Sequence, residues 1–180
     1  MNSPYITIPE GLPGIRGPLS LRPEVAKPLS ALAEVVMRAD HSLTRGEREL
    51  IAGYVSYLNN CYFCEMAHSS VAQYYLQCST DFMKIIKSDF NEAAISDKLK
   101  ALLTIAHSVV KGGKHVTESQ VEKAKAHGAT DVEIHDVVLI AAMFCMFNRY
   151  TDGLNTWAPR DLDFYINRAP AIAEKGYSID

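Results

Sequence analysis

Apolar residues recur every three or four positions along most of the chain, which is the spacing of a helix with one buried face. The pattern begins in the stretch PLSALAEVVMRA, residues 28–39, and hardly changes towards the C-terminus. A strand would alternate apolar and polar residues, and only the short stretch YITI, residues 5–8, comes near to this. The sequence therefore predicts an all-α fold, built as a compact helical bundle.

Signals for helix starts and ends divide this pattern into elements. Three predicted helices open with a threonine followed three residues later by Glu or Gln, the spacing of a capping box: Thr44/Glu47, Thr117/Gln120 and Thr130/Glu133. Glycines at 112, 113 and 128 favour helix ends. We therefore expect helices over residues 23–39, 44–58, 61–77, 79–88, 95–111, 117–128 and 130–153, and a short one near the C-terminus.

The N-terminal part differs from the rest in composition. Residues 1–28 contain six of the eight prolines and three of the ten glycines, which disfavours helix. We expect residues 1–28 to form an extended segment that wraps over the surface. Residues 29–180 are expected to form a single all-α domain with a C-terminal tail.

Candidate chemistry is concentrated in ELIAGYVSYLNNCYFCEMAHS, residues 49–69, where Cys61 and Cys64 precede His68. If a helix begins at the first cysteine, these three side chains fall on one face of it. The positive end of the helix dipole then favours a thiolate at Cys61, and such cysteine pairs commonly have one pKa lowered to about 3.5–7.5. The spacing also suits a disulfide across the first turn. The pair is therefore a candidate redox site in which one thiol attacks and the other resolves.

A carboxylate can be carried to the same face. Glu49 lies twelve residues before Cys61 on the preceding helix, and the short NNC turn predicts that the two helices pack antiparallel. Glu47 is already explained as the partner of the Thr44 cap. We therefore expect Glu49 to hold or relay a proton through His68.

Two other interpretations of the motif follow from the residues. Cys61, Cys64 and His68 would supply three zinc ligands, but a structural zinc site takes four and the chain has no second CxxC or HxxxH pair. The same residues would also fit a helix face buried without chemistry. We expect neither a metal nor a cofactor. The remaining cysteines and the histidines within predicted helices are interpreted as packing or surface residues: Cys78, Cys145, His107 and His135.

Composition and charge exclude several classes of function. The chain has 180 residues, 48% of them hydrophobic and 22% charged, and a net charge of −3 that gives no basic surface for nucleic acid. The longest apolar run, residues 137–147, is shorter than the about 20 residues that span a bilayer. No secretory signal pattern opens the sequence. We therefore expect a cytoplasmic protein that binds neither nucleic acid nor membrane.

On these residues the chain resembles the AhpD-like alkylhydroperoxidases, a branch of the carboxymuconolactone decarboxylase superfamily. The resemblance rests on the pattern E-x(11)-C-x-x-C-x-x-x-H, formed by Glu49, Cys61, Cys64 and His68, and on GATDVEIHDVVLIAAMFCMFNRY at residues 128–150. It implies an AhpD-like all-α fold, a homo-oligomer and cofactor-free reduction of hydroperoxides. It further implies that Cys64 attacks the peroxide through a sulfenic acid, that Cys61 resolves it as a disulfide, and that Glu49 and His68 relay protons. The reductant would be a dithiol, which is lipoyl-bearing in the best-known members.

One position departs from the family pattern. Phe63 stands between the cysteines, where those members carry a second histidine. Two alternatives therefore stay open. The first is a thiol–disulfide oxidoreductase or redox sensor that turns over peroxide weakly. The second is a non-catalytic oligomeric binding protein, because excess apolar helix surface in so small a chain also favours self-association.

Overall fold

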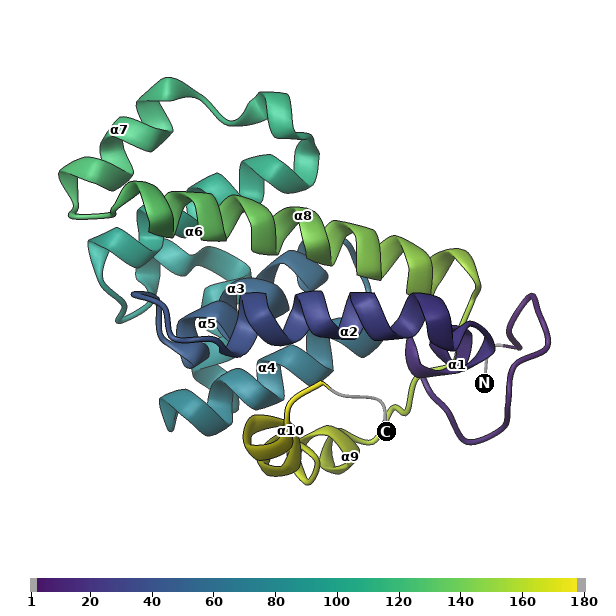
Figure 1. Cartoon of the computed structure of the whole chain (residues 1–180). Coiled ribbons are helices and arrows are strands. Elements are labelled where there is room, and N and C mark those ends of the chain that lie inside the picture. The colour runs from purple at the N-terminus through teal and green to yellow at the C-terminus, as the bar shows by residue number, and fades with distance from the viewer. Residues whose placement is uncertain (1–2, 178–180) are drawn as a thin grey trace.

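The computed structural model describes residues 3–177, and it contains helices but no strand over that range (Figure 1). The described residues form ten α-helices: α1 (Arg16–Leu21), α2 (Pro23–Arg38), α3 (Arg45–Leu58), α4 (Tyr62–Leu76), α5 (Thr80–Asp89), α6 (Asp97–Lys111), α7 (Glu118–Ala126), α8 (Asp131–Gly153), α9 (Leu162–Ile166) and α10 (Ala169–Lys175). Two short 3-10 turns, Phe90–Glu92 and Gly113–His115, flank α6. The all-α fold class is thus confirmed. No helix in the described part of the chain has the length and apolar character that a membrane span requires.

Capping chemistry fixes the helix starts where the sequence predicts them. In each of the three predicted capping boxes the threonine side chain accepts from the third helical N–H, and the Glu or Gln side chain accepts from the threonine N–H: Thr44/Glu47, Thr117/Gln120 and Thr130/Glu133. Ser79 and Ser96 cap α5 and α6 in the same way through their hydroxyls. These bonds satisfy backbone donors that a helix start otherwise leaves unpaired.

The helices α3 and α4 form a closely packed antiparallel pair. Asn60 makes the short turn between them with φ 59°, a left-handed conformation that Asn tolerates better than most residues. A Cβ added at Gly53 would lie 2.9 Å from Ser69 Oγ, and one at Gly46 would lie 2.6 Å from Leu76 Cδ2. The two glycines thus let the helices approach along their whole length.

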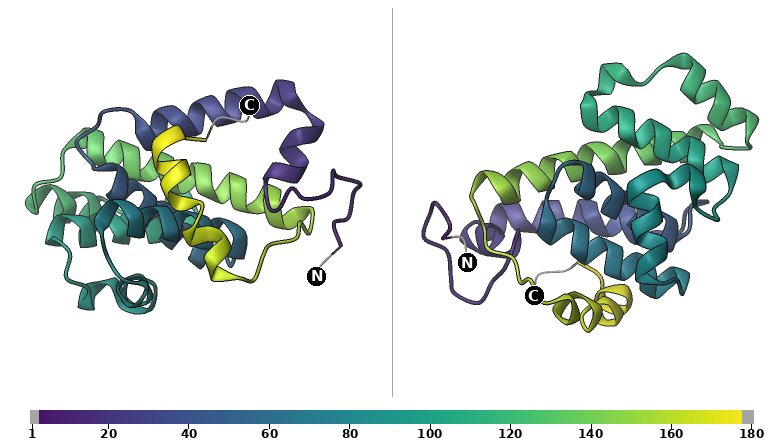
Figure 2. Two further views of the ribbon diagram at one scale, coloured as in Figure 1. Left: turned by 90° about the horizontal axis from the view of Figure 1, so that it is seen from below. Right: turned by 180° about the vertical axis from the view of Figure 1, so that it is seen from behind.

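The long helix α8 runs through the middle of the molecule and packs against α3 and α6 (Figures 1 and 2). Its buried side chains include Ile140, Phe144 and Phe147, and the main hydrophobic core forms where they meet Leu50 of α3 and Leu102 of α6. The sequence predicted that this apolar segment would be the central buried helix, and the structure confirms it.

The expectation of an extended segment over residues 1–28 is wrong from Arg16 onwards, because α1 and the first part of α2 are helical. Proline disfavours a helix only where its missing N–H is needed. Pro18 and Pro23 lie in first turns, where that N–H has no partner within the helix. Pro28 lies inside α2 at an exposed position, where water can solvate the carbonyl that it leaves unpaired.

The chain after α8 turns back across α4. Both α9 and α10 contact α4, and the left view of Figure 2 shows them crossing beneath the bundle. Arg38 of α2 donates to the carbonyl oxygens of Ile172 (3.2 Å) and Glu174 (3.1 Å). The backbone N–H of Tyr177 donates to Glu34 Oε2 at 3.1 Å. The C-terminal tail is thereby fixed between α2 and α4, and it carries Tyr177 into the interior.

Candidate active site

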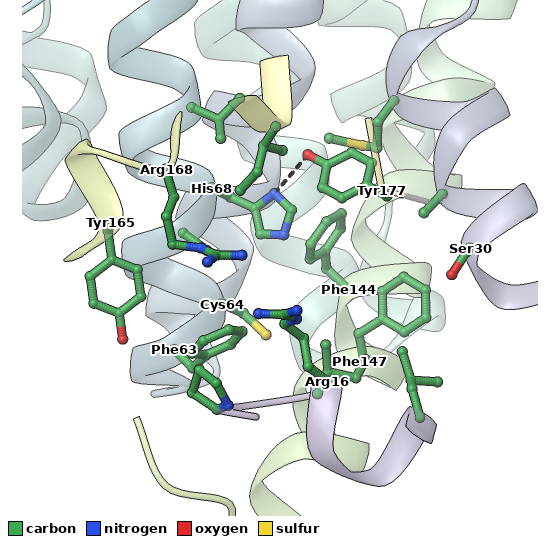
Figure 3. A pocket seen from close by; sticks show the side chains of 18 of the residues that line it. Arg16, Ser30, Phe63, Cys64, His68, Phe144, Phe147, Tyr165, Arg168 and Tyr177 are labelled. Atoms are coloured by element: carbon green, nitrogen blue, oxygen red, sulfur yellow. Dashed lines mark hydrogen bonds between the residues drawn. The ribbon is translucent and has the colours of Figure 1, made fainter. Parts of the chain in front are cut away.

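The two cysteines of the motif lie at the start of α4 and are both buried free thiols. Cys61 is the residue that precedes the helix, and its backbone N–H donates to the Ser56 carbonyl at 3.0 Å. Cys64, one turn on, is 3% exposed and forms part of a pocket wall (Figure 3). The Cys61 thiol donates a hydrogen bond to the sulfur of Cys64. The two thiols are therefore near enough to influence each other's ionisation.

The close approach of α3 and α4 places a carboxylate against the histidine of the motif. Glu49 is 1% exposed, and its Oε2 lies 2.7 Å from His68 Nδ1. The Phe144 ring packs edge-on against the His68 ring, with 4.5 Å between the ring centroids. Burial lowers the pKa of His68, but the charge and hydrogen bond of Glu49 outweigh it, so that the pKa is raised. An imidazole held in this way keeps its proton and its orientation.

A third polar group joins this pair from the C-terminal tail. The Tyr177 hydroxyl donates to Glu49 Oε1 and lies 3.4 Å from His68 Nδ1 (Figure 3). Burial raises the pKa of Tyr177 well above its usual value, and the Glu49 charge adds to this, so the hydroxyl stays protonated and acts as a donor. Sequence analysis missed Tyr177, since nothing in the tail marks one tyrosine among several as buried.

The environment of Cys64 favours its thiolate. The hydrogen bond from Cys61 lowers the pKa of Cys64, burial opposes this, and the charge of His68 lowers the pKa again. Side-chain hydrogen bonds with Thr151 and Asn148 lower the pKa of Cys64 further. The net effect is a Cys64 pKa below the usual value, which is what a nucleophilic thiol needs.

The expectation of a stabilised thiolate at Cys61 is wrong. Donation to Cys64 and burial raise the pKa of Cys61, and the nearby carboxylate of Asp152 acts in the same direction. Cys61 precedes the helix and makes no capping hydrogen bond with its side chain, so it gains little from the helix start. The pKa values of the two thiols thus shift in opposite directions, which favours the proton on Cys61 and the charge on Cys64.

The groups that face Cys64 from α8 were not found from the sequence. Thr151 Oγ1 lies 3.9 Å from Cys64 Sγ. Asn148 accepts from Asn59 Nδ2 at 2.9 Å and donates to Ser56 Oγ at 3.1 Å, which ties α8 to the turn before the cysteines. Polar residues at 148 and 151 in an otherwise apolar helix were the available signal, because buried polar groups need partners.

Cys64 and His68 open into a pocket of about 240 Å³. Its wall is mostly apolar: Leu19, Leu29, Met37, Val71, Phe144 and Phe147. Phe63 lies in the same wall between Tyr165, at 6.0 Å between ring centroids, and Gly14, where an added Cβ would lie 2.1 Å from the Phe63 ring. The position where the family carries a second histidine is thus filled here by an aromatic ring that packs against both terminal segments.

The other cysteines and histidines that the sequence singled out do not line this pocket. Cys145 Sγ accepts from Asn59 Nδ2 at 3.5 Å, and His135 Nδ1 lies 3.0 Å from Asp136 Oδ1. Cys78 lies just beyond α4. Within residues 3–177 no group of three or more His, Cys, Asp or Glu side chains is arranged to hold a metal ion.

Comparison with known proteins gives a family and several structural relatives. Residues 79–158 match the model of the carboxymuconolactone decarboxylase family. A peroxidase-related protein from Ralstonia eutropha, described as an alkylhydroperoxidase AhpD core, is 27% identical with a TM-score of 0.76 over 86% of this chain and 80% of its own. No match was found among curated proteins.

Two further solved structures share the fold at lower identity. A peroxidase-related protein from Silicibacter is 22% identical with a TM-score of 0.74, over 84% of this chain and 78% of its own. A putative antioxidant defence protein AhpD from Agrobacterium tumefaciens is 21% identical with a TM-score of 0.71, over 82% of this chain and 99% of its own.

Fold, family match and relatives define an AhpD-like helical protein. The family match and the Ralstonia eutropha structure both support the resemblance to the AhpD-like, peroxidase-related branch of the carboxymuconolactone decarboxylase superfamily that the cysteine motif indicated. The matched residues 79–158 include Asn148 and Thr151 but neither Cys61 nor Cys64. The resemblance therefore supports an antioxidant role in general terms, and the matched segment does not contain the cysteine pair.

Proposed function

We propose that the protein is a cofactor-free cysteine peroxidase that reduces organic hydroperoxides through Cys64 and Cys61. One observation carries the proposal: a buried thiol with a lowered pKa, Cys64, forms the wall of an apolar pocket beside the hydrogen-bonded Glu49–His68 pair. A thiolate is the nucleophile that peroxide reduction needs, and a nearby proton donor assists its leaving group.

In the first half of the reaction the Cys64 thiolate attacks the terminal oxygen of the hydroperoxide. A sulfur–oxygen bond forms while the oxygen–oxygen bond breaks, which leaves a sulfenic acid on Cys64 and an alkoxide. His68 gives the alkoxide its proton, because the raised pKa keeps the imidazole charged. Glu49 and the Tyr177 hydroxyl hold the ring in place and balance the change in its charge.

In the second half Cys61 attacks the sulfur of the Cys64 sulfenic acid. A disulfide forms, and the hydroxyl leaves as water with the proton of the Cys61 thiol. The sum is one hydroperoxide and two thiols converted to one alcohol, one water and one disulfide. A dithiol reductant, of the lipoyl type that the family resemblance implies, would then return both thiols by exchange and be oxidised itself.

The deciding experiment follows peroxide consumption by the reduced protein with dihydrolipoamide as reductant. Wild type is compared with Cys64→Ser and Cys61→Ser, and the cysteines are analysed by mass spectrometry after one turnover. We expect Cys64→Ser to be inactive and Cys61→Ser to stop with one added oxygen on Cys64. Trapped oxygen on Cys61 in the reverse variant would contradict the assignment of roles.

A thiol–disulfide oxidoreductase is the second candidate, and Phe63 is the observation that favours it. An apolar ring packed between Tyr165 and Gly14 cannot donate a proton where the family has a histidine. This candidate predicts rapid exchange with small disulfides and slow reaction with peroxide. A Phe63→His variant that raises the peroxide rate without changing the exchange rate would support it.

Self-association is also part of the proposal. Leu32 and Val35 of α2 lie one turn apart and are 39% and 60% exposed, which leaves an apolar stripe without cover in the described chain. We expect native mass spectrometry to show a homo-oligomer, and a Val35→Asp variant to shift it towards the monomer. A monomer at all concentrations would contradict the proposed self-association. The non-catalytic binding alternative requires both cysteine variants to leave every activity unchanged.

A further inference from the structure

Two arginines line the mostly apolar pocket. Arg16 of α1 and Arg168, at the start of α10, both line it, and Figure 3 shows their guanidinium groups pointing into it. Both residues are exposed, so that solvent reaches their side chains. They come from the two ends of the chain and enter the pocket that holds Cys64.

These two charges are close enough to repel each other. Burial lowers the pKa of Arg16, and the positive charge of Arg168 lowers it further. Two like charges held near one another cost free energy unless an anion lies between them. The arrangement therefore favours a negatively charged guest between the two guanidinium groups.

The described chain offers no such anion of its own. Among residues 3–177 neither guanidinium has a carboxylate partner. The Arg168 guanidinium lies over the Phe164 ring, with its Cζ 5.2 Å from the ring centroid. No Asp or Glu occurs among the described residues that line the pocket. The arginines do not stabilise the Cys64 thiolate either. The groups that lower its pKa are Cys61, His68, Thr151 and Asn148.

The rest of the wall fits a hydrocarbon body. Leu19, Leu29, Phe144 and Phe147 line the pocket, and its volume of about 240 Å³ is slightly below the roughly 300–1,000 Å³ typical of small-molecule sites. A ligand that fits has a compact apolar body, which the wall removes from water, and a single anionic head, which the arginines hold in bidentate hydrogen bonds.

We infer that the preferred substrate is an organic hydroperoxide that also carries a carboxylate, such as a medium-chain fatty-acid hydroperoxide, with its carboxylate between Arg16 and Arg168. The inference rests on the proposed peroxidase function. It adds the substrate class. The arginines bind the carboxylate of the substrate, the apolar wall covers its hydrocarbon chain, and its peroxide group reaches Cys64. Arg16 and Arg168 act in binding and specificity, and the bonds that form and break are those given above.

The first test measures binding without chemistry. Octanoate and 1-octanol have the same chain length and differ in the charged head, so calorimetry with the reduced protein isolates the contribution of the charge. We expect octanoate to bind about tenfold more tightly, since two partly solvated arginine contacts contribute about 0.2–1 kcal/mol each or somewhat more when bidentate. The preference should shrink as salt is raised.

The matched variants are Arg16→Gln with Arg168→Gln, and Arg160→Gln as control. Arg160 lies in the same C-terminal tail but stacks over Tyr62, at 4.2 Å from the ring centroid, and does not line the pocket. The double variant should bind octanoate and octanol within about twofold of each other, whereas Arg160→Gln should keep the wild-type ratio. Equal binding of the two ligands by wild type would overturn the inference, as would a preference that survives in the double variant.

The second test separates the substrate class from the peroxidase itself. It compares kcat/KM for a fatty-acid hydroperoxide and for its methyl ester, in wild type and in the double variant. A preference for the acid that falls in the double variant supports the inference. Equal rates for acid and ester in wild type would overturn the substrate class and leave the peroxidase standing. An arginine-dependent preference for octanoate with no turnover of any peroxide would instead overturn the peroxidase and, with it, this choice of substrate.

Discussion

The α3–α4 pair and the two terminal segments both contribute to one pocket, but in different ways. The α3–α4 region provides the proposed reactive groups, Glu49, Cys61, Cys64 and His68, from helices that pack closely at Gly46 and Gly53. The terminal segments around α1 and α9–α10 provide the cover of the pocket and its two arginines. The difference suggests that chemistry and selectivity are carried by separate parts of the fold, and that each can be altered by itself.

The largest expected effect comes from the nucleophile. Cys64→Ser should lower peroxide reduction by more than about 10³-fold, because a serine hydroxyl does not ionise in the range where this thiol does. Steady-state assays with dihydrolipoamide measure the change, and Cys78→Ser, at a thiol outside the pocket, serves as the control. Residual activity near the wild-type level would show that Cys64 is not the nucleophile.

The second effect tests the charge pair of the α3–α4 region. Glu49→Gln removes the group that raises the pKa of His68 and leaves burial, which lowers it, so the pKa should fall. The proposed reaction needs Cys64 deprotonated and His68 protonated, so kcat/KM should drop about 10²-fold near neutral pH. The alkaline limb of its pH profile, which reports loss of the His68 proton, should move to lower pH.

The matched control for this variant is Glu47→Gln, on the same helix, where glutamine can still complete the cap. It should keep the wild-type pH profile. An unchanged alkaline limb in Glu49→Gln would show that His68 is not the group that titrates.

The third effect concerns the packing that brings the pair together. Gly53→Ala puts a Cβ 2.9 Å from Ser69 Oγ and should destabilise the protein by about 1–3 kcal/mol, through forced separation of α3 and α4. Urea unfolding measures it. Gly153→Ala, where an added Cβ meets nothing within 4 Å, should be neutral or slightly stabilising. Equal stability of the two variants would mean that the close approach is not required.

The smallest effect tests the terminal contribution to the relay. Tyr177→Phe deletes a hydrogen bond to the buried Glu49 and should lower kcat/KM about fivefold, with a loss of about 1–2 kcal/mol in stability. Tyr75→Phe is the control, since Tyr75 anchors the same tail through the Ala173 carbonyl at 2.8 Å without touching Glu49. If both variants lose activity alike, the tail acts through its position and not through the Tyr177 hydroxyl.

The same contrast explains what could be predicted from the sequence. Cys61, Cys64 and His68 share one helix, and Glu49 lies one tight turn away, so local periodicity was enough to place them together. The assignment of the thiolate to Cys61 failed because the balance depends on Asp152, Thr151 and Asn148, which arrive from α8.

Residues that come from distant elements left no local signal. Tyr177, Arg16 and Arg168 enter the pocket only because the two ends of the chain fold across α4 and α2. The N-terminal segment was misjudged for a related reason. Proline content argues against helix on average, whereas the effect of each proline depends on where the helix starts.

The burial of the cysteine pair has a consequence for the speed of the whole cycle. Cys61 has no exposed surface and Cys64 has 3%, so in the proposed cycle a reductant would reach their disulfide only when the surrounding structure opens. The rate of disulfide reduction would then depend on that opening, and small reductants should react faster than bulky ones of equal redox potential.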